Sequence, residues 1–199
     1  MGFRRLAAAA ALALACATAA PPGPKAPPPR DYAAEAFAAR KANDFAKAEA
    51  IASAGIDAGE ASAKLYFERG VARMALKNQD GALDDFRRVN AIQEDPAALL
   101  LAGSIELQQA RWADAEKDLA RSVALDPKNA RAWASLAQAR IAQKDLPGAI
   151  AANDKAVALA PADPFVKEVG DRLARATPKP ADAALQPAAA PAAPPAPAK

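Results

Sequence analysis

Paired acidic side chains are the residues of this sequence that come nearest to a catalytic or metal-binding arrangement. One pair is Asp84 and Asp85, and the other is Glu116 and Asp118; each pair lies in a predicted helix. Carboxylate pairs can serve as general acid and base or as metal ligands. Basic residues stand beside these pairs at helical spacing, namely Arg87, Arg88, Lys117 and Arg121. This alternation of charge indicates a solvated helix face rather than a reactive site.

The residue types that most enzyme and metal sites require are missing from the chain. Its 199 residues include no histidine, and the single cysteine is Cys16. This excludes histidine-based acid–base catalysis, Ser–His and Cys–His nucleophiles and the usual zinc ligand sets. No glycine-rich loop leads into a lysine followed by serine or threonine, so a nucleotide phosphate loop is also missing. We therefore expect no enzyme, no catalytic residue, no metal, no cofactor and no small-molecule substrate.

The charge of the chain gives no indication of a nucleic-acid partner. The formal net charge is +3, and Arg4 and Arg5 supply two of the positive charges within a predicted signal segment. Proteins that bind nucleic acid carry a basic block or stripe that neutralises phosphates. The sequence has no such block, and we expect no nucleic-acid partner.

The N-terminal segment MGFRRLAAAAALALAC places two arginines before an apolar run that ends at Cys16. The run is shorter than the roughly 20 residues of a membrane-spanning helix and is typical of a secretion signal. Its last residues, LALAC, resemble the bacterial lipobox, although Ala13 stands where leucine is most common. The resemblance implies a signal peptide over residues 1–15, cut before Cys16, and lipidation of Cys16. The alternative is an ordinary signal peptide cut after Ala17 or Ala19.

Proline marks the borders of the predicted domain. Of the 18 prolines, 13 lie in two tails, before residue 30 and after residue 177. Pro/Ala-rich segments are extended and cannot bury a core. The composition therefore predicts a Pro-rich linker over residues 16–29, a folded domain over 30–176 and a disordered Pro/Ala-rich tail over 177–199.

The folded part contains four copies of one pattern, over residues 31–56, 64–92, 98–127 and 132–161. The bulky residues that open the copies are spaced by 34, 33 and 34 positions: Tyr32, Tyr66, Leu99 and Trp133. Small residues follow four positions later, at Ala36, Gly70, Gly103 and Ala137. Further small residues recur in the second half of each copy, at Ala48, Ala82, Ala115 and Ala149. Small side chains allow two helices to approach closely, so each copy is predicted to be a helix pair.

This pattern is similar to the tetratricopeptide repeat (TPR), a pair of antiparallel helices that stacks into a solenoid. The resemblance implies an all-α TPR solenoid of three clear and one degenerate helix-pair repeats plus a C-terminal capping helix. The first copy is the degenerate one, because Glu35 and Ala52 stand where larger apolar residues are expected. Asp80 and Asp145 are expected to cap second helices. The capping helix is predicted from residues on one helical face, namely Phe165, Val166, Val169 and Leu173.

In TPR proteins the first helices line a concave groove that holds an extended peptide or a helix. By resemblance, the groove residues here are Phe37, Arg40, Phe67, Val71, Met74, Leu100, Ser104, Leu107, Gln138 and Ile141. Most are apolar, which favours a hydrophobic or amphipathic protein or peptide partner. TPR domains that grip a C-terminal carboxylate use lysine and asparagine along this line. This chain has other residue types there, so we do not expect such a clamp.

Together these features predict a non-catalytic protein–protein interaction adaptor of the bacterial cell envelope. The N-terminal acyl chain would anchor it to a membrane at the periplasmic face. Because Ala17 rather than aspartate follows Cys16, the resemblance to lipoproteins implies the outer membrane; without lipidation the protein would be soluble in the periplasm. The alternative function is a fixed structural subunit of an envelope assembly such as a pilus, secretion or outer-membrane machine.

Overall fold

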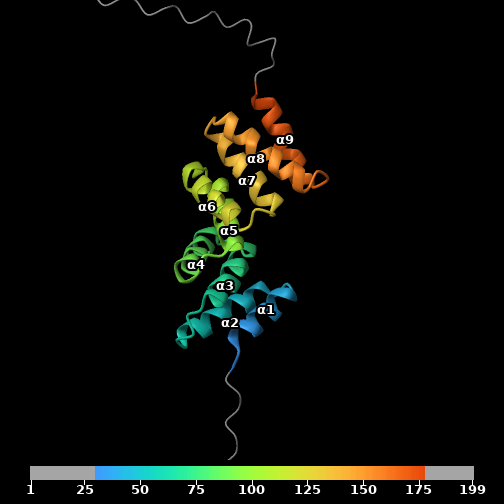
Figure 1. Ribbon diagram of the computed structural model, residues 1–199. Coiled ribbons are helices and arrows are strands. Elements are labelled where there is room, and N and C mark those ends of the chain that lie inside the picture. The colour runs from blue at the N-terminus through green and yellow to red at the C-terminus, as the bar shows by residue number, and fades with distance from the viewer. Residues whose placement is uncertain (1–29, 178–199) are drawn as a thin grey trace, which may run out of the picture. The chain divides into compact units, whose positions relative to one another are not determined.

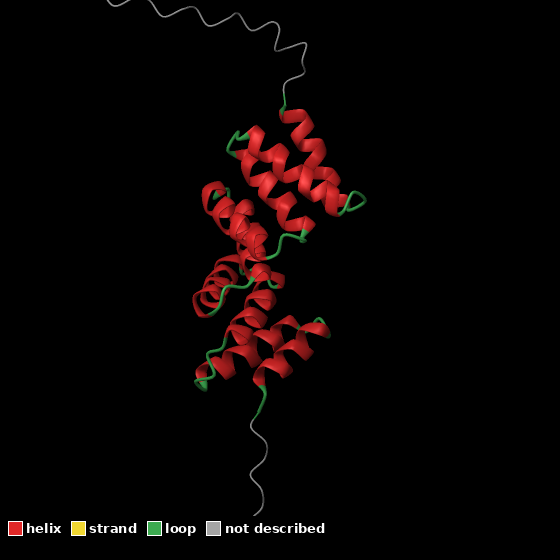
Figure 2. Cartoon of the chain, in the orientation of Figure 1, coloured by secondary structure: helices red, strands yellow, loops and turns green. Residues whose placement is uncertain are grey.

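The computed structural model describes residues 30–177, and this part of the chain consists of α-helices without strands (Figures 1 and 2). The helices are α1 (Tyr32–Lys41), α2 (Phe45–Asp57), α3 (Ala63–Ala75), α4 (Gln79–Ile92), α5 (Pro96–Gln108), α6 (Trp112–Leu125), α7 (Ala130–Ala142), α8 (Leu146–Leu159) and α9 (Pro164–Ala176). The predicted signal peptide, Cys16, the linker and the tail from residue 178 lie outside the described residues. No helix within the described range is long and apolar enough to cross a membrane.

Short polar side chains start most of these helices. Asp145 caps α8 as predicted, because its side chain accepts a hydrogen bond from the Gly148 amide. The prediction that Asp80 caps α4 is wrong, since the cap is Asn78, two residues earlier, which accepts from the Gly81 amide at 3.0 Å. Each such cap satisfies a backbone N–H that has no partner within the helix.

The helices pack in antiparallel pairs, which we call repeat 1 (α1, α2), repeat 2 (α3, α4), repeat 3 (α5, α6) and repeat 4 (α7, α8). Glycine allows the close approach in two of them. A Cβ added to Gly70 would lie 2.9 Å from the ring of Phe86, and one added to Gly103 would lie 2.6 Å from Leu119. The small residues of the repeat thus make room for a large side chain of the second helix. The final helix, α9, packs on both α7 and α8 and caps the stack.

Arginines at one repeated position join successive repeats. Arg73 of α3 donates to Glu49 of the preceding repeat at 2.8 Å and to Asp85 of its own repeat at 3.0 Å. Arg140 of α7 stands at the same position of repeat 4 and donates to Glu116 of repeat 3 at 2.9 Å. The two arginines therefore connect repeat 1 to repeat 2 and repeat 3 to repeat 4.

The junction between repeats 2 and 3 is built differently. Its connection, residues 93–95, is one residue shorter than the connections 126–129 and 160–163. Among the described helices α1 packs on α3 and α5 packs on α7, whereas α3 and α5 have at most marginal contact. The all-α prediction, with four helix pairs and a capping helix, is confirmed. The interruption after repeat 2 was not predicted.

Candidate protein-binding groove

The first helices α1, α3, α5 and α7 carry all of the predicted groove residues, and we call the surface that these helices form the first-helix face. We describe the residues in two groups, because the backbones of α1 and α3, and those of α5 and α7, approach more closely than those of α3 and α5. The first group lies on α1 and α3: Phe37, Arg40, Phe67, Val71 and Met74. The second lies on α5 and α7: Leu100, Ser104, Leu107, Gln138 and Ile141. Whether the two groups form one continuous groove stays a prediction.

Phe37 is the exposed apolar residue of the first group, with 41% of its surface accessible. The charged ends of Arg40 and Lys41 lie 5.0 and 5.6 Å from the centre of its ring. Arg40 also pairs with Glu68 of α3, which is 4% exposed, so Arg40 has a structural role between repeats 1 and 2. Because Phe37 stays this exposed beside its two cation–π contacts, part of its surface can contact a partner.

The remaining residues of the first group serve mainly in packing. Phe67, Val71 and Met74 are partly buried against the core between α3, α4 and α5. The ring of Phe67 meets that of Phe86 edge-on, with centroids 5.9 Å apart. These three side chains are partly exposed, so each can offer part of its surface to a partner.

The second group surrounds a cavity of about 250 Å³ between α5, α7 and α9. The lining residues are Ser104, Leu107, Gln108, Ser135, Gln138 and Phe165. Three predicted groove residues, Ser104, Leu107 and Gln138, thus come together at one place. Leu100 and Ile141 are partly buried against the adjoining core and are not in the lining.

The lining residues differ in what they offer to a partner. Leu107 is only 7% exposed and belongs to the core. The Ser104 hydroxyl donates to the Leu100 carbonyl at 2.7 Å, and the Gln108 amide oxygen accepts from Gln79 at 2.6 Å. Gln138 is partly exposed and makes no hydrogen bond with any other described residue, so its amide is free to donate and to accept.

The size of the cavity indicates what kind of group fits. Sites for small molecules usually measure about 300–1,000 Å³, so this cavity falls below that range. It is suited to a single side chain of a bound segment, with Phe165 and Leu107 as apolar walls and Gln138 as the polar group. Within the described residues no group of three or more histidine, cysteine, aspartate or glutamate side chains is placed to hold a metal ion.

Sequence reasoning did not assign Gln108, Ser135 and Phe165 to the groove. Helical spacing places Gln108 one turn after Ser104, and Ser135 one turn before Gln138. That spacing is a usable signal for these two residues. Phe165 was assigned only to the core side of the capping helix, and its place beside the cavity depends on how α9 packs on α7.

Comparisons with known proteins agree with this architecture. The tetratricopeptide repeat family matches residues 100–164. Among solved structures, the MamA RS-1 ArsTM double mutant superimposes with a TM-score of 0.66 at 21% identity, covering 73% of this chain and 85% of that one. YrrB, described as a TPR protein with an unusual peptide-binding site, superimposes with a TM-score of 0.62 at 15% identity, covering 75% of this chain and 87% of that one.

A third structure, the first TPR of Spaghetti (RPAP3) bound to the HSP90 peptide SRMEEVD, gives a TM-score of 0.55 at 21% identity, covering 58% of this chain and 92% of that one. No curated protein matches the chain. The match over residues 100–164 and the stacked helix pairs show that the described residues form a TPR solenoid.

Proposed function

We propose that this protein is a non-catalytic adaptor that binds a segment of a protein partner on its first-helix face. The observation that carries the proposal is the cavity between α5, α7 and α9, where the free amide of Gln138 lies beside the ring of Phe165. A cavity that accepts one side chain, next to partly exposed apolar residues, suits an amphipathic helix or extended segment. The peptide-binding descriptions of YrrB and of the RPAP3 domain support the same use of this fold.

The proposed partner is apolar rather than an acidic C-terminal peptide. The positions that would carry a carboxylate clamp hold Val71, Ser104 and Gln138 in place of asparagine. Phe67, Leu100 and Ala134 stand at the lysine positions, and Ala134 is fully buried. Without lysine or asparagine at these places, the surface cannot make the charge-assisted hydrogen bonds that hold a carboxylate.

Photo-crosslinking inside cells tests this proposal. A photoreactive side chain replaces Gln138 at the cavity, and a control replaces Arg88, which is exposed on α4 away from the first-helix face. A discrete protein adduct from position 138 and none from position 88 is expected. Equal adducts, or adducts only from position 88, would contradict binding at the cavity. Stoichiometric co-purification with a larger complex would instead favour the fixed structural subunit of an envelope assembly.

We also propose that the adaptor works in the bacterial cell envelope, anchored by an acyl chain on Cys16 and facing the periplasm from the outer membrane. The support is the sequence of the N-terminal segment alone, which lies outside the described residues. Replacing the cysteine (Cys16→Ser) should move the protein from the membrane fraction to the soluble fraction and remove an acyl mass from its N-terminus. A parent protein without that mass, cut after Ala17 or Ala19, would show a secreted and unanchored form.

A further inference from the structure

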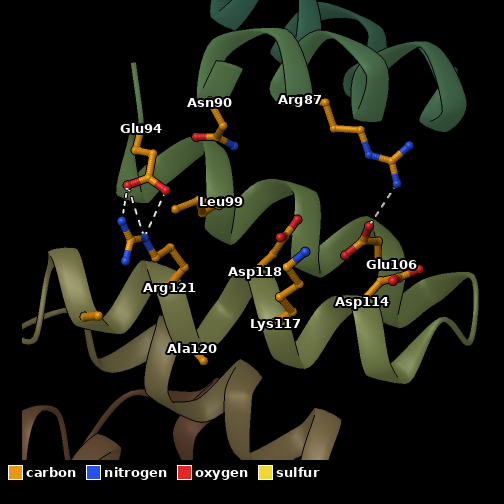
Figure 3. Close-up of a pocket in the computed structure, with 11 residues that line it drawn as sticks. Arg87, Asn90, Glu94, Leu99, Glu106, Asp114, Lys117, Asp118, Ala120 and Arg121 are labelled. Atoms are coloured by element: carbon orange, nitrogen blue, oxygen red, sulfur yellow. Dashed lines mark hydrogen bonds and ion pairs between the residues drawn. The ribbon is translucent and has the colours of Figure 1, made fainter. Parts of the chain in front are cut away.

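A larger cleft lies at the junction of repeats 2 and 3, between α4, α5 and α6, and measures about 790 Å³ (Figure 3). It shares no lining residue with the cavity between α5, α7 and α9. Figure 3 shows Arg121 bound to Glu94 at one end of the cleft and Arg87 reaching toward Glu106 at the other. Asp118 and Lys117 of α6 lie between them.

The same place in repeat 2 is filled by an arginine of the protein itself. The Arg69 guanidinium donates to Asp85 at 2.7 and 3.0 Å and lies 5.5 Å from the ring centre of Tyr66. A weaker contact of 3.5 Å joins it to Ser53 of repeat 1, and Arg73 donates to Oδ2 of Asp85, which also accepts from Arg69. Asp85 is only 1% exposed, so these two guanidinium groups compensate a buried carboxylate.

Repeat 3 keeps the carboxylate but lacks both arginines. The internal alignment equates Asp85 with Asp118, and it equates Arg69 and Arg73 with Ala102 and Glu106. The residues that surround Arg69, Ser53 and Tyr66, correspond to Arg87 and Leu99. Asp118, Arg87 and Leu99 all line the cleft. The cleft is therefore lined by residues that correspond to the surroundings of Arg69 in repeat 2.

Glu106 gives a second, independent sign of a missing partner. Its side chain is 2% exposed, and its Oε1 accepts from Arg87 at 3.2 Å and lies 3.6 Å from Arg111. Its Oε2 is buried and accepts no hydrogen bond from the described residues. Asp118 is partly exposed and has no ion pair within 4 Å in the described part of the chain, although Arg87 and Lys117 lie near enough for their charges to oppose the rise of its pKa. A buried acceptor without a donor is costly, so Oε2 of Glu106 favours a group that donates hydrogen bonds.

We propose that the cleft binds a guanidinium group from outside the chain, in the place that Arg69 takes in repeat 2. A guanidinium presents five N–H donors in one plane, so it can bridge Asp118 and the free Oε2 of Glu106. An anion is disfavoured because the inner polar atoms are acceptors and because Arg121 is already paired with Glu94. Burial raises the pKa of Asp118 and of Glu106, against the opposing charges of Arg87 and Arg111.

The test is an NMR titration of the full-length protein at low salt. Three probes are compared: acetyl-Gly-Arg-Gly-amide, the same peptide with citrulline, in which a neutral ureido group replaces the guanidinium, and methylguanidinium. The arginine peptide and methylguanidinium should shift the amide signals around Glu106 and Asp118, and the citrulline peptide should not. Tighter binding of the peptide would assign the site to an arginine of a protein, and equal binding would assign it to a free guanidinium compound.

Three variants complete the test. Asp118→Asn should weaken the arginine peptide roughly tenfold or more, as expected for a hydrogen bond to a charged group. Glu106→Gln serves as a second variant with the same expected direction. Asp154→Asn, an exposed change of the same charge on α8, should leave binding unchanged. No shift at the cleft, equal shifts with citrulline, or unchanged binding in both cleft variants would overturn the proposal, without bearing on the first-helix face.

Discussion

Two glycines at the middle of 13-residue helices should respond in opposite ways to the same substitution. In Gly103→Ala, the new Cβ would lie 2.6 Å from Cγ of Leu119, which is fully buried and cannot move away freely. In Gly170→Ala, the nearest atoms belong to Asn153 at 3.7 Å, an ordinary contact distance. Both changes gain the same helix propensity, about 1 kcal/mol.

The difference in stability between the two variants therefore measures the steric clash with Leu119 alone. Overpacking a core typically lowers the free energy of unfolding by about 1–3 kcal/mol. The short distance between the new Cβ and Leu119 places the cost of Gly103→Ala toward the upper end of this range. Gly103→Ala should lower the free energy of unfolding by about 1–2 kcal/mol, and Gly170→Ala should raise it by up to about 1 kcal/mol. The midpoint temperatures should differ by roughly 5–10 °C. Urea and thermal unfolding followed by circular dichroism gives both values, and equal stabilisation of the two variants would refute the packing of Gly103 against Leu119.

Two further predictions concern buried carboxylates. Asp85→Ala removes the shared partner of Arg69 and Arg73 and should lower the free energy of unfolding by about 3 kcal/mol. Asp84→Ala changes an exposed neighbour and should alter the free energy of unfolding by no more than about 0.5 kcal/mol. Similar losses from both variants in urea unfolding would argue against the buried network. Burial, and then the nearby Asp118, raise the pKa of Glu106 despite two neighbouring arginines, so the protonated form favours the folded state. That stability is complete below the ordinary glutamate value of about 4.3 and is lost as pH rises through the raised pKa. Glu106→Gln should therefore stabilise the protein at pH 7 and have little effect at pH 4, and a destabilised variant at pH 7 would show that the ionised carboxylate is well compensated.

The repeat spacing was sufficient to predict the helix pairs and the capping helix. Small residues such as Gly70 and Gly103 mark the crossing points, and their role follows directly from steric exclusion. Even the degenerate first copy forms a complete pair, because Ala52 is fully buried and needs no larger side chain there. Local pattern and close packing thus agree over the whole described domain.

The site was less predictable because it depends on how the repeats meet. The single 33-residue interval is visible in the sequence, but its effect on the contact between α3 and α5 is a property of three-dimensional packing. Leu107 has the residue type and spacing of a groove position, yet the core between repeats 3 and 4 buries it. Repeat 3 has Ala102 and Glu106 where repeat 2 has two arginines. The sequence shows this difference, but its consequence for the cleft follows only from the contacts that Arg69 makes in the structure.

Binding of a partner segment at the cavity between α5, α7 and α9 can be measured directly by isothermal titration calorimetry. The segment identified by crosslinking is titrated into the native protein, into Gln138→Arg, which puts a bulky charge into the cavity, and into Arg88→Ala as a control. Gln138→Arg should raise the dissociation constant at least tenfold, a change of about 1.4 kcal/mol in binding free energy, and Arg88→Ala should change it less than twofold. Unchanged affinity in a folded Gln138→Arg variant would contradict the claim.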